Sequence, residues 1–365
     1  MTPSSLVKSM RVDQLLREGK KSIEFALFGS EYMNVAQELL DTFNFVLTKG
    51  FGSAGIYYES PLGKGLLKGD LSFFLRRESF YRNKHVMPVS SCFPCRLVID
   101  SEWQKVMTLM DCWVTQEPFK STFHQNLFFE FDLESVSLNS IPLPGVFFGC
   151  QAGEGSSDFI KASLELLEVR YNHESCGLLR KLLEEVLDKT CMVQVGVMLS
   201  RPGKPLRIVI FNQTPQMRKA ILDYLGFSSL IIENQEIWEA IEVYQDGISG
   251  ISLDFLPELG PRLGIEIDFS QQSNVCFSRR HHLFKDLLHF FDKKGLCEQE
   301  KVEAVLAFPS CFEYRVEYGN QCIVMKHDIN HVKIDFKPNK NPLIKIYLRS
   351  ILTEKFSHNN IKEFV

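Results

Sequence analysis

Polar and charged residues alternate with apolar residues in several short runs of this chain, and these runs hold its best candidates for chemistry. In the run 331–336, His331, Lys333 and Asp335 fall on one face, because successive side chains of a strand point to opposite sides. The same spacing groups the following residues on one face of their own runs: Glu130 and Asp132; Ser252 and Asp254; Glu266 and Asp268; Lys345, Tyr347 and Arg349. Charges of both signs that converge in an enclosed space would form a binding site for a small molecule.

The remaining motifs favour ordinary structural positions. Cys92 and Cys95 have redox-motif spacing, but they lack the strand-to-helix context of a thioredoxin-like site, and no second Cys pair completes a zinc site. His327 and His331 are four residues apart and are expected to be polar positions, not metal ligands. The chain has neither a GxxxxGK[ST] phosphate loop nor a GxSxG nucleophile elbow. We therefore predict no metal-ligating residues.

The alternating runs occur in pairs that meet across a turn, which predicts β-hairpins. The four pairs are Asn126–Asp132 with Gly145–Cys150, Met192–Leu199 with Arg207–Phe211, Gly250–Leu256 with Leu263–Phe269, and Asn330–Phe336 with Leu343–Arg349. A weaker fifth pair joins Ile56–Tyr58 to Leu71–Leu75, with Arg96–Asp100 as a competing strand. A stretch typical of a helix separates most pairs, so a repeated unit of two strands and a helix covers most of the chain.

Apolar residues at a spacing near 3.6 predict the helices between these pairs. The expected ranges are Glu31–Phe45, Ser101–Asp111, Ser175–Lys189, Thr214–Leu225, Glu236–Val243, Leu283–Lys293 and Glu298–Phe308. Ser101 is the expected N-cap residue of the second helix. We expect residues 1–365 to form a single domain, with 1–50 as an N-terminal helical segment, 51–350 as the repeated units and 351–365 as a polar tail.

The composition indicates a globular protein that works inside the cell. Of 365 residues, 45% are hydrophobic and 30 are Phe, enough for thick apolar layers or an apolar pocket. A formal charge of −4 argues against a general nucleic-acid binder. No run approaches the roughly 18–20 apolar residues that cross a bilayer, and the N-terminus lacks the apolar core of a secretory signal. Together with ten Cys in no framework spacing, these features predict a cytoplasmic protein without nucleic-acid or membrane partners.

The polar faces allow two architectures of the α+β class. In one, an open antiparallel sheet is covered by helices on one face, and its charged side chains are hydrated. In the other, the four or five pairs supply eight to ten strands, and a twisted sheet of that size tends to close into a barrel. If the sheet closes with the helices outside, the polar face of the sheet would line an enclosed lumen.

The repeated αββα pattern resembles the aromatic prenyltransferases of the ABBA, or PT-barrel, type. The resemblance covers roughly residues 30–350 and is carried by the architecture and by strands such as 250–255 (GISLDF), 331–336 (HVKIDF) and 344–349 (IKIYLR). It implies an antiparallel β-barrel with helices outside and a polar lumen. In that lumen a prenyl group would pass from an allylic diphosphate to an aromatic small molecule or a peptide side chain.

The resemblance also implies roles for the residues on the polar faces. Cationic and hydroxyl groups would bind the diphosphate, since they suit phosphate oxygens; the candidates are Arg207, Lys333, Lys345, Tyr347 and Arg349. A carboxylate would orient or deprotonate the acceptor, and Glu130, Asp254 and Glu266 compete for that role. Metal dependence varies in this class, so Mg²⁺ is an optional cofactor, and the chain has no DDxxD run. The alternative is a non-catalytic accessory protein that binds a small molecule or a peptide in the same cavity.

Overall fold

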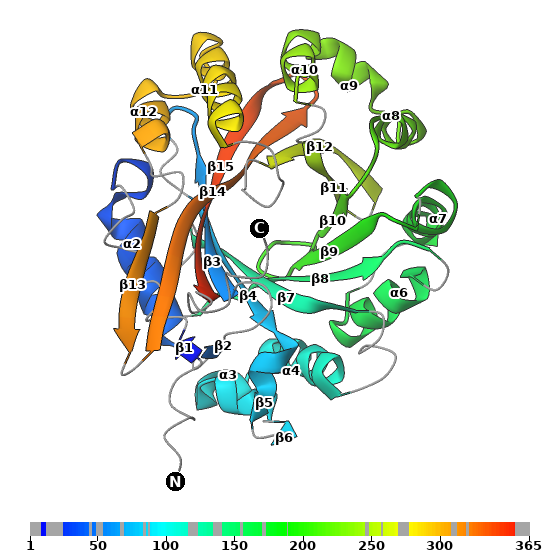
Figure 1. The fold of residues 1–365 in the computed structure, drawn as a ribbon. Coiled ribbons are helices and arrows are strands. Elements are labelled where there is room, and N and C mark those ends of the chain that lie inside the picture. Colours follow the sequence, from blue (N-terminus) through cyan, green and yellow to red (C-terminus); the bar gives the residue numbers. More distant parts are fainter. Residues whose placement is uncertain are drawn as a thin grey trace, which may run out of the picture.

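The computed structural model arranges the chain around one antiparallel β-barrel, seen along its axis in Figure 1. The structure describes residues 9–11, 25–43, 46–48, 54–65, 69–82, 85–86, 88–115, 123–133, 141–153, 156–169, 173–187, 189–244, 248–256, 258–268, 277–307, 312–318 and 321–354. The expected tail therefore lies outside the described residues from position 355 onward.

Five hairpins build the wall of the barrel within the described part of the chain. They are β3 (Ala54–Pro61) with β4 (Asp70–Arg76), β7 (Phe123–Asp132) with β8 (Gly145–Gln151), β9 (Met192–Met198) with β10 (Leu206–Phe211), β11 (Ile248–Leu256) with β12 (Glu258–Asp268), and β14 (Gln321–Lys337) with β15 (Lys340–Glu354). All neighbours pair antiparallel, and β3 pairs with β15. The ring closes because β12 pairs with β14, from Leu263 opposite Phe336 to Asp268 opposite His331. The predicted closed barrel of the α+β class is confirmed, including the weaker fifth pair.

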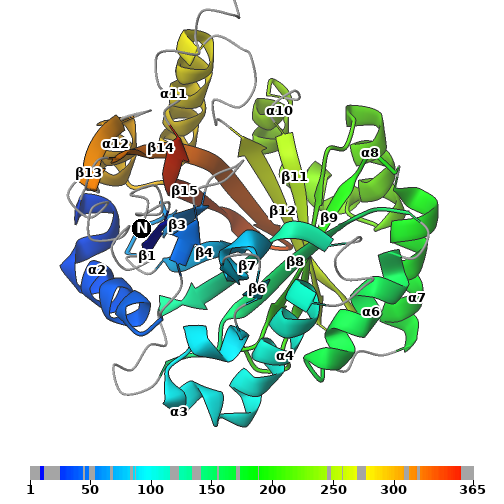
Figure 2. The same ribbon diagram turned by 60° about the horizontal axis from the view of Figure 1, so that its bottom comes forward.

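Helices lie outside the barrel wall and connect its hairpins (Figures 1 and 2). They are α2 (Phe25–Asp41), α3 (Cys95–Val98), α4 (Ser101–Thr115), α6 (Ser156–Leu166), α7 (His173–Lys181), α8 (Pro215–Tyr224), α9 (Ser228–Glu233), α10 (Gln235–Glu242), α11 (Phe277–Lys293) and α12 (Gln299–Ala307). Among the described residues, none of these helices is long and apolar enough to cross a membrane.

Shorter strands and single helical turns lie outside the ring of ten strands. The strand β13 (Phe312–Tyr318) pairs with the first half of β14 and extends the sheet beyond the ring. Two short ladders join β1 (Ser9–Arg11) to β2 (Val46–Thr48) and β5 (Tyr81–Arg82) to β6 (His85–Val86). Single turns complete the order: η2 (Arg77–Phe80), η3 (Val89–Cys92) and the π-helical η5 (Leu182–Val186).

The main core lies between the barrel wall and the helices. Its aromatic centre is Phe43, whose ring centroid lies 6.0 Å from Phe73 of β4, 5.7 Å from Phe131 of β7 and 5.8 Å from Trp103 of α4. All four side chains are buried. Side chains of a strand point alternately to its two faces. The strands that pack Phe73 and Phe131 against the outer helices therefore point their polar side chains into the lumen. This packing explains much of the Phe content.

Three sequence predictions about local structure are wrong. Residues Arg96–Asp100 do not form a strand, because α3 occupies Cys95–Val98. The carboxylate of Asp100 accepts hydrogen bonds from the backbone N–H groups of Glu102 and Trp103 at 2.9 and 3.1 Å, so Asp100 caps α4 in place of Ser101. The N-terminal segment is not wholly helical, since β1 and β2 lie within residues 1–50.

A close backbone approach at Gly69 supports a first prediction. A Cβ at this position would lie 1.7 Å from the carbonyl oxygen of Glu59 on the neighbouring strand β3. Because backbone cannot move aside as a flexible side chain can, we expect Gly69→Ala to lower the free energy of unfolding by about 1–3 kcal/mol. Urea denaturation would measure this loss. The matched control is Gly177→Ala in α7, where a Cβ meets nothing within 4 Å and where a gain of about 0.5–1 kcal/mol is expected.

Candidate ligand-binding site in the barrel lumen

A cavity of about 800 Å³ occupies the lumen. Its wall combines charged groups, aromatic rings and uncharged polar groups. The charged and phenolic members are Glu130, Arg207, Glu266, Asp268, Lys333 and Tyr347, and the aromatic members include Tyr57, Phe128, Phe147 and Phe211. A volume of this size is typical of sites for small organic ligands.

The structure brings the predicted site residues into one lumen but at two depths. Five of them, Glu130, Arg207, Glu266, Lys333 and Tyr347, line the cavity. Three others, Asp254, Lys345 and Arg349, do not belong to its described wall. Arg349 is buried at 5% exposure, on the same face of β15 as Lys345 and Tyr347.

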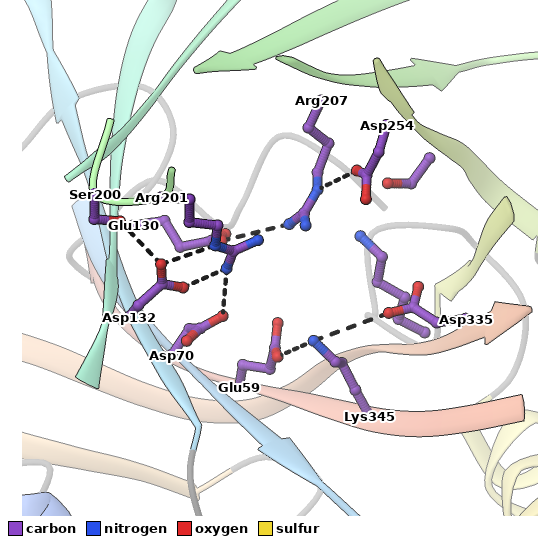
Figure 3. A network of polar contacts seen from close by, with 12 residues as sticks. Glu59, Asp70, Glu130, Asp132, Ser200, Arg201, Arg207, Asp254, Asp335 and Lys345 are labelled. Carbon is purple, nitrogen blue, oxygen red and sulfur yellow. Dashed lines mark hydrogen bonds and ion pairs between the residues drawn. The ribbon is translucent and has the colours of Figure 1, made fainter. Parts of the chain in front are cut away.

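Asp254 and Lys345 belong to a ring of ion pairs that crosses the barrel near its hairpin turns, which we call the ionic belt (Figure 3). The ionic belt consists of Glu59, Asp70, Asp132, Arg201, Arg207, Asp254, Arg262, Asp335 and Lys345. Signs alternate around much of the ring. Arg207 Nε lies 3.0 Å from Asp254 Oδ1, and Arg262 bridges Asp254 at 2.9 Å and Asp335 at 2.5 Å.

The other side of the ionic belt is richer in acid. Lys345 bonds to Glu59 and lies 3.9 Å from Asp335, and the Tyr347 hydroxyl also donates to Glu59. Arg201 contacts Asp132, with its Nε 2.8 Å from Oδ2, and lies 3.8 Å from Asp70.

Burial and neighbouring charges set the protonation of these carboxyl groups. Burial alone would raise the pKa of Asp254, but Arg207 and Arg262 lower it below its ordinary value. Burial and the charges of Glu59 and Glu130 raise the pKa of Asp70 well above its ordinary value. The pKa shifts therefore favour the anion of Asp254, and they make Asp70 easier to protonate than an ordinary Asp.

The two predicted bases that line the cavity, Glu130 and Glu266, differ in the same way. Lys333 Nζ lies 2.9 Å from Glu266 Oε1 and lowers the pKa of Glu266, against the raising effect of burial. Glu130 has only a 3.5 Å contact with Arg207 Nη1, and burial raises its pKa despite the Arg207 charge. Of the three predicted bases, Glu130 is therefore the one whose pKa is raised, and it also faces the cavity.

Sequence reasoning missed Glu59 and Arg262, which are 4% and 6% exposed. The expected strand at Ile56–Tyr58 stopped one residue before Glu59, although β3 continues to Pro61. Arg262 lies in the segment 257–262 (PELGPR), whose Pro and Gly residues are typical of a turn. In the structure residues 258–262 are already part of β12, with Gly260 against the backbone of Asp254. The alternation that continues from Glu266 and Gly264 to Arg262 was the available signal.

Solved structures of prenyltransferases are similar to this chain at low identity. PriB in its apo form gives a TM-score of 0.48 at 9% identity, covering 92% of this chain and 94% of that chain. The 5-dimethylallyltryptophan synthase from Streptomyces coelicolor gives 0.45 at 11% identity, covering 92% and 95%. AnaPT from Neosartorya fischeri gives 0.45 at 10% identity, covering 84% and 80%. No protein-family model and no curated protein matches the chain.

Ten described strands close into one antiparallel ring with αββα repeats and helices outside, as the sequence repeat predicted. This arrangement is the PT-barrel fold. In this PT-barrel, three lumen carboxylates could hold a divalent cation: ligand atoms of Asp70, Glu130 and Asp132 lie within 4.8 Å of one another. Carboxylate oxygens suit Mg²⁺, although Arg201 already occupies Asp132 and a bound cation would compete with it.

Proposed function

We propose that this PT-barrel is a prenyltransferase that ionises an allylic diphosphate in its lumen and transfers the prenyl group to an aromatic small molecule or a peptide side chain. The observation that carries the proposal is the composition of the enclosed cavity. Arg207, Lys333 and Tyr347 face the same space as Glu130 and a group of aromatic rings. This combination supplies groups for an anion, a carbocation and a proton.

In the proposed complex the diphosphate lies against Arg207 and Lys333, with the Tyr347 hydroxyl as a further donor once its hydrogen bond to Glu59 breaks. Cationic donors form strong hydrogen bonds to phosphate oxygens. Each cation is already ion-paired: Arg207 with Asp254 at 3.0 Å and with Glu130 at 3.5 Å, and Lys333 with Glu266 at 2.9 Å. The diphosphate would compete with these carboxylates. Lys345 supports Tyr347 through their shared partner Glu59, and Arg349 lies outside the described cavity wall.

The chemistry of transfer follows from the groups that remain. Cleavage of the allylic C–O bond leaves the electron pair on the diphosphate and the positive charge on the prenyl fragment. The aromatic faces of Tyr57, Phe128 and Phe147 stabilise that cation. The acceptor nucleophile forms the new bond to the prenyl carbon, and Glu130 takes the proton that the acceptor releases. Asp254 and Glu266 are weaker candidates because their cationic partners lower the pKa of each.

A second function has one specific observation in its favour. Both cavity cations are ion-paired with carboxylates within the described lumen, which leaves less free positive charge for a diphosphate than a dedicated anion site would offer. A non-catalytic protein that binds a polar small molecule or a peptide in the same cavity would have such a balanced lining.

Diphosphate binding is the first test of the proposed function. The full chain should bind dimethylallyl or geranyl diphosphate in calorimetry. Lys333→Met should weaken that binding by about 10- to 100-fold, since a charge-assisted hydrogen bond contributes about 1.5–3 kcal/mol. The control is Lys340→Met at the exposed β14–β15 turn, which should bind as the natural chain does.

The double variant Lys333→Met/Glu266→Gln keeps this test interpretable, because it removes the charge of Glu266 that the single variant leaves unpaired. A folded sample that binds neither diphosphate would refute the proposed function. Binding without a prenylated product, when aromatic acceptors are supplied and masses are measured, would favour the non-catalytic alternative.

A further inference from the structure

Uncharged polar side chains line the cavity at the end opposite the ionic belt. This end lies where β10 passes into α8 and where β12 ends beside β14, because Phe211 is opposite Gly250 and Asp268 is opposite His331. We call these side chains the amide rim: Asn212, Gln213, Thr214, Ser249, Asn330 and His331. The amide rim is the part of the lumen that the proposed chemistry leaves unused.

Two members of the amide rim have buried polar atoms without hydrogen-bond partners in the part of the chain that the structure describes. Gln213 is 7% exposed, and neither its Oε1 nor its Nε2 has a partner. Nε2 of His331 is also without a partner. A buried polar group that lacks a hydrogen bond is destabilising, so both groups need a structural explanation.

The hydrogen position on His331 follows from its neighbour. The Asn330 side-chain nitrogen lies 2.7 Å from Nδ1 of His331. An amide nitrogen can only donate, so Nδ1 accepts and the neutral ring carries its hydrogen on Nε2. Burial lowers the pKa of His331, which favours this neutral form. The unpartnered Nε2 is therefore a donor.

Local packing holds these two groups in the cavity wall. Thr214 caps α8, since its hydroxyl accepts from the backbone N–H of Met217 at 3.2 Å, and this fixes the chain directly after Gln213. The ring of His331 stacks on Tyr347 with centroids 4.1 Å apart. Because both residues line the cavity, a ligand in it can supply the missing partners.

The unpartnered atoms match an uncharged amide. The Gln213 side chain offers both a donor and an acceptor, and His331 adds a donor, which together suit the N–H and C=O groups of a carboxamide or a peptide bond. A free amino acid would instead bring a carboxylate towards Asp268, and Lys333, the cation of the described cavity wall nearest to His331 in the strand, is already paired with Glu266 at 2.9 Å. The lining therefore favours an acceptor without a free carboxylate.

We propose that the amide rim binds a backbone or terminal amide of the acceptor through Gln213 and His331, so that the acceptor is an aromatic residue within a peptide or an amide, not a free amino acid. This inference rests on the proposed function, because it assigns the acceptor of the same cavity. Gln213 and His331 act as specificity-determining residues and take no part in the proposed proton transfer to Glu130.

Calorimetry on the full chain tests this proposal with defined probes. These are the N-acetyl amides of tryptophan, tyrosine and phenylalanine, each compared with its free amino acid. At least one amide should bind, at least about tenfold more tightly than the corresponding amino acid. Gln213→Met should weaken the amide about tenfold, the effect of about one lost hydrogen bond, and should leave the affinity for dimethylallyl diphosphate unchanged. The variant should unfold at the same or a higher Tm, because Met has no polar atom to leave unpaired.

Gln235→Met on the exposed helix α10 is the matched control and should bind every probe as the natural chain does. His331→Phe keeps an aromatic ring beside Tyr347 and removes the donor, so it tests the same site independently. Equal binding of amides and free amino acids, no binding of any amide, or unchanged amide binding in both variants would overturn the proposal. Amide binding without diphosphate binding would refute the proposed function but would still support amide binding at the amide rim.

Discussion

Glu130→Gln is expected to lower the rate of prenyl transfer by about 10²- to 10⁴-fold, the usual contribution of a positioned general base. The substitution keeps the size of the side chain but removes its ability to accept the proton of the acceptor. Diphosphate affinity should stay close to that of the natural chain or improve, because the 3.5 Å ion pair with Arg207 loses its negative partner. The measurement is product formation at saturating diphosphate, with binding followed separately by calorimetry.

The pH dependence of the rate gives a readout that a purely structural role would not. Burial raises the pKa of Glu130, and a base works only as the carboxylate. The rate of the natural chain should therefore rise as the pH increases through this raised pKa, and Glu130→Gln should lack that rise. Glu239→Gln on the exposed face of α10 is the control and should leave both quantities unchanged. A Glu130→Gln variant with more than about a tenth of the natural rate would assign the base elsewhere.

Arg262→Met is expected to lower the free energy of unfolding by about 3–5 kcal/mol, the usual cost of removing one partner from a buried ion pair. Arg262 is 6% exposed and bridges Asp254 at 2.9 Å and Asp335 at 2.5 Å. Its loss would leave Asp335 with Lys345 at 3.9 Å as its remaining cation in the described ionic belt. Urea denaturation at neutral pH would measure the change.

The loss should shrink in acid. Burial alone would raise the pKa of Asp335, but Arg262 lowers it, so the natural chain gains stability above the unfolded-state pKa and loses that gain as the pH falls. Lys219→Met breaks an exposed pair with Asp223, whose side chains are 78% and 49% exposed, and should change stability by less than about 1 kcal/mol. Equal losses from Arg262→Met and Lys219→Met would show that the ionic belt does not stabilise the barrel.

Local sequence was sufficient for most of the helices and strands and for the face of the strand that most inward side chains occupy. Period-two alternation assigned Glu130, Glu266 and Lys333 to one side of their strands, and the structure buries them in one lumen. The hairpins could be predicted because their turns join runs that are close in sequence. Two inward residues, Glu59 and Arg262, were missed because nearby Pro and Gly residues interrupted the alternating pattern.

Only the tertiary structure decided which of the inward residues reach the cavity. Alternation gives the face of a residue but not its height along the barrel axis, which depends on the register between strands far apart in sequence, such as β12 with β14 and β3 with β15. Lys333 and Lys345 are direct cross-strand neighbours, yet Lys333 lines the cavity beside Glu266 and Lys345 turns to Glu59 in the ionic belt. The amide rim likewise exists only because closure brings the end of β10 and the middle of β14 to the same end of the lumen. The sequence thus determined that polar faces would exist, and the closing pair β12–β14 decided that they enclose a cavity.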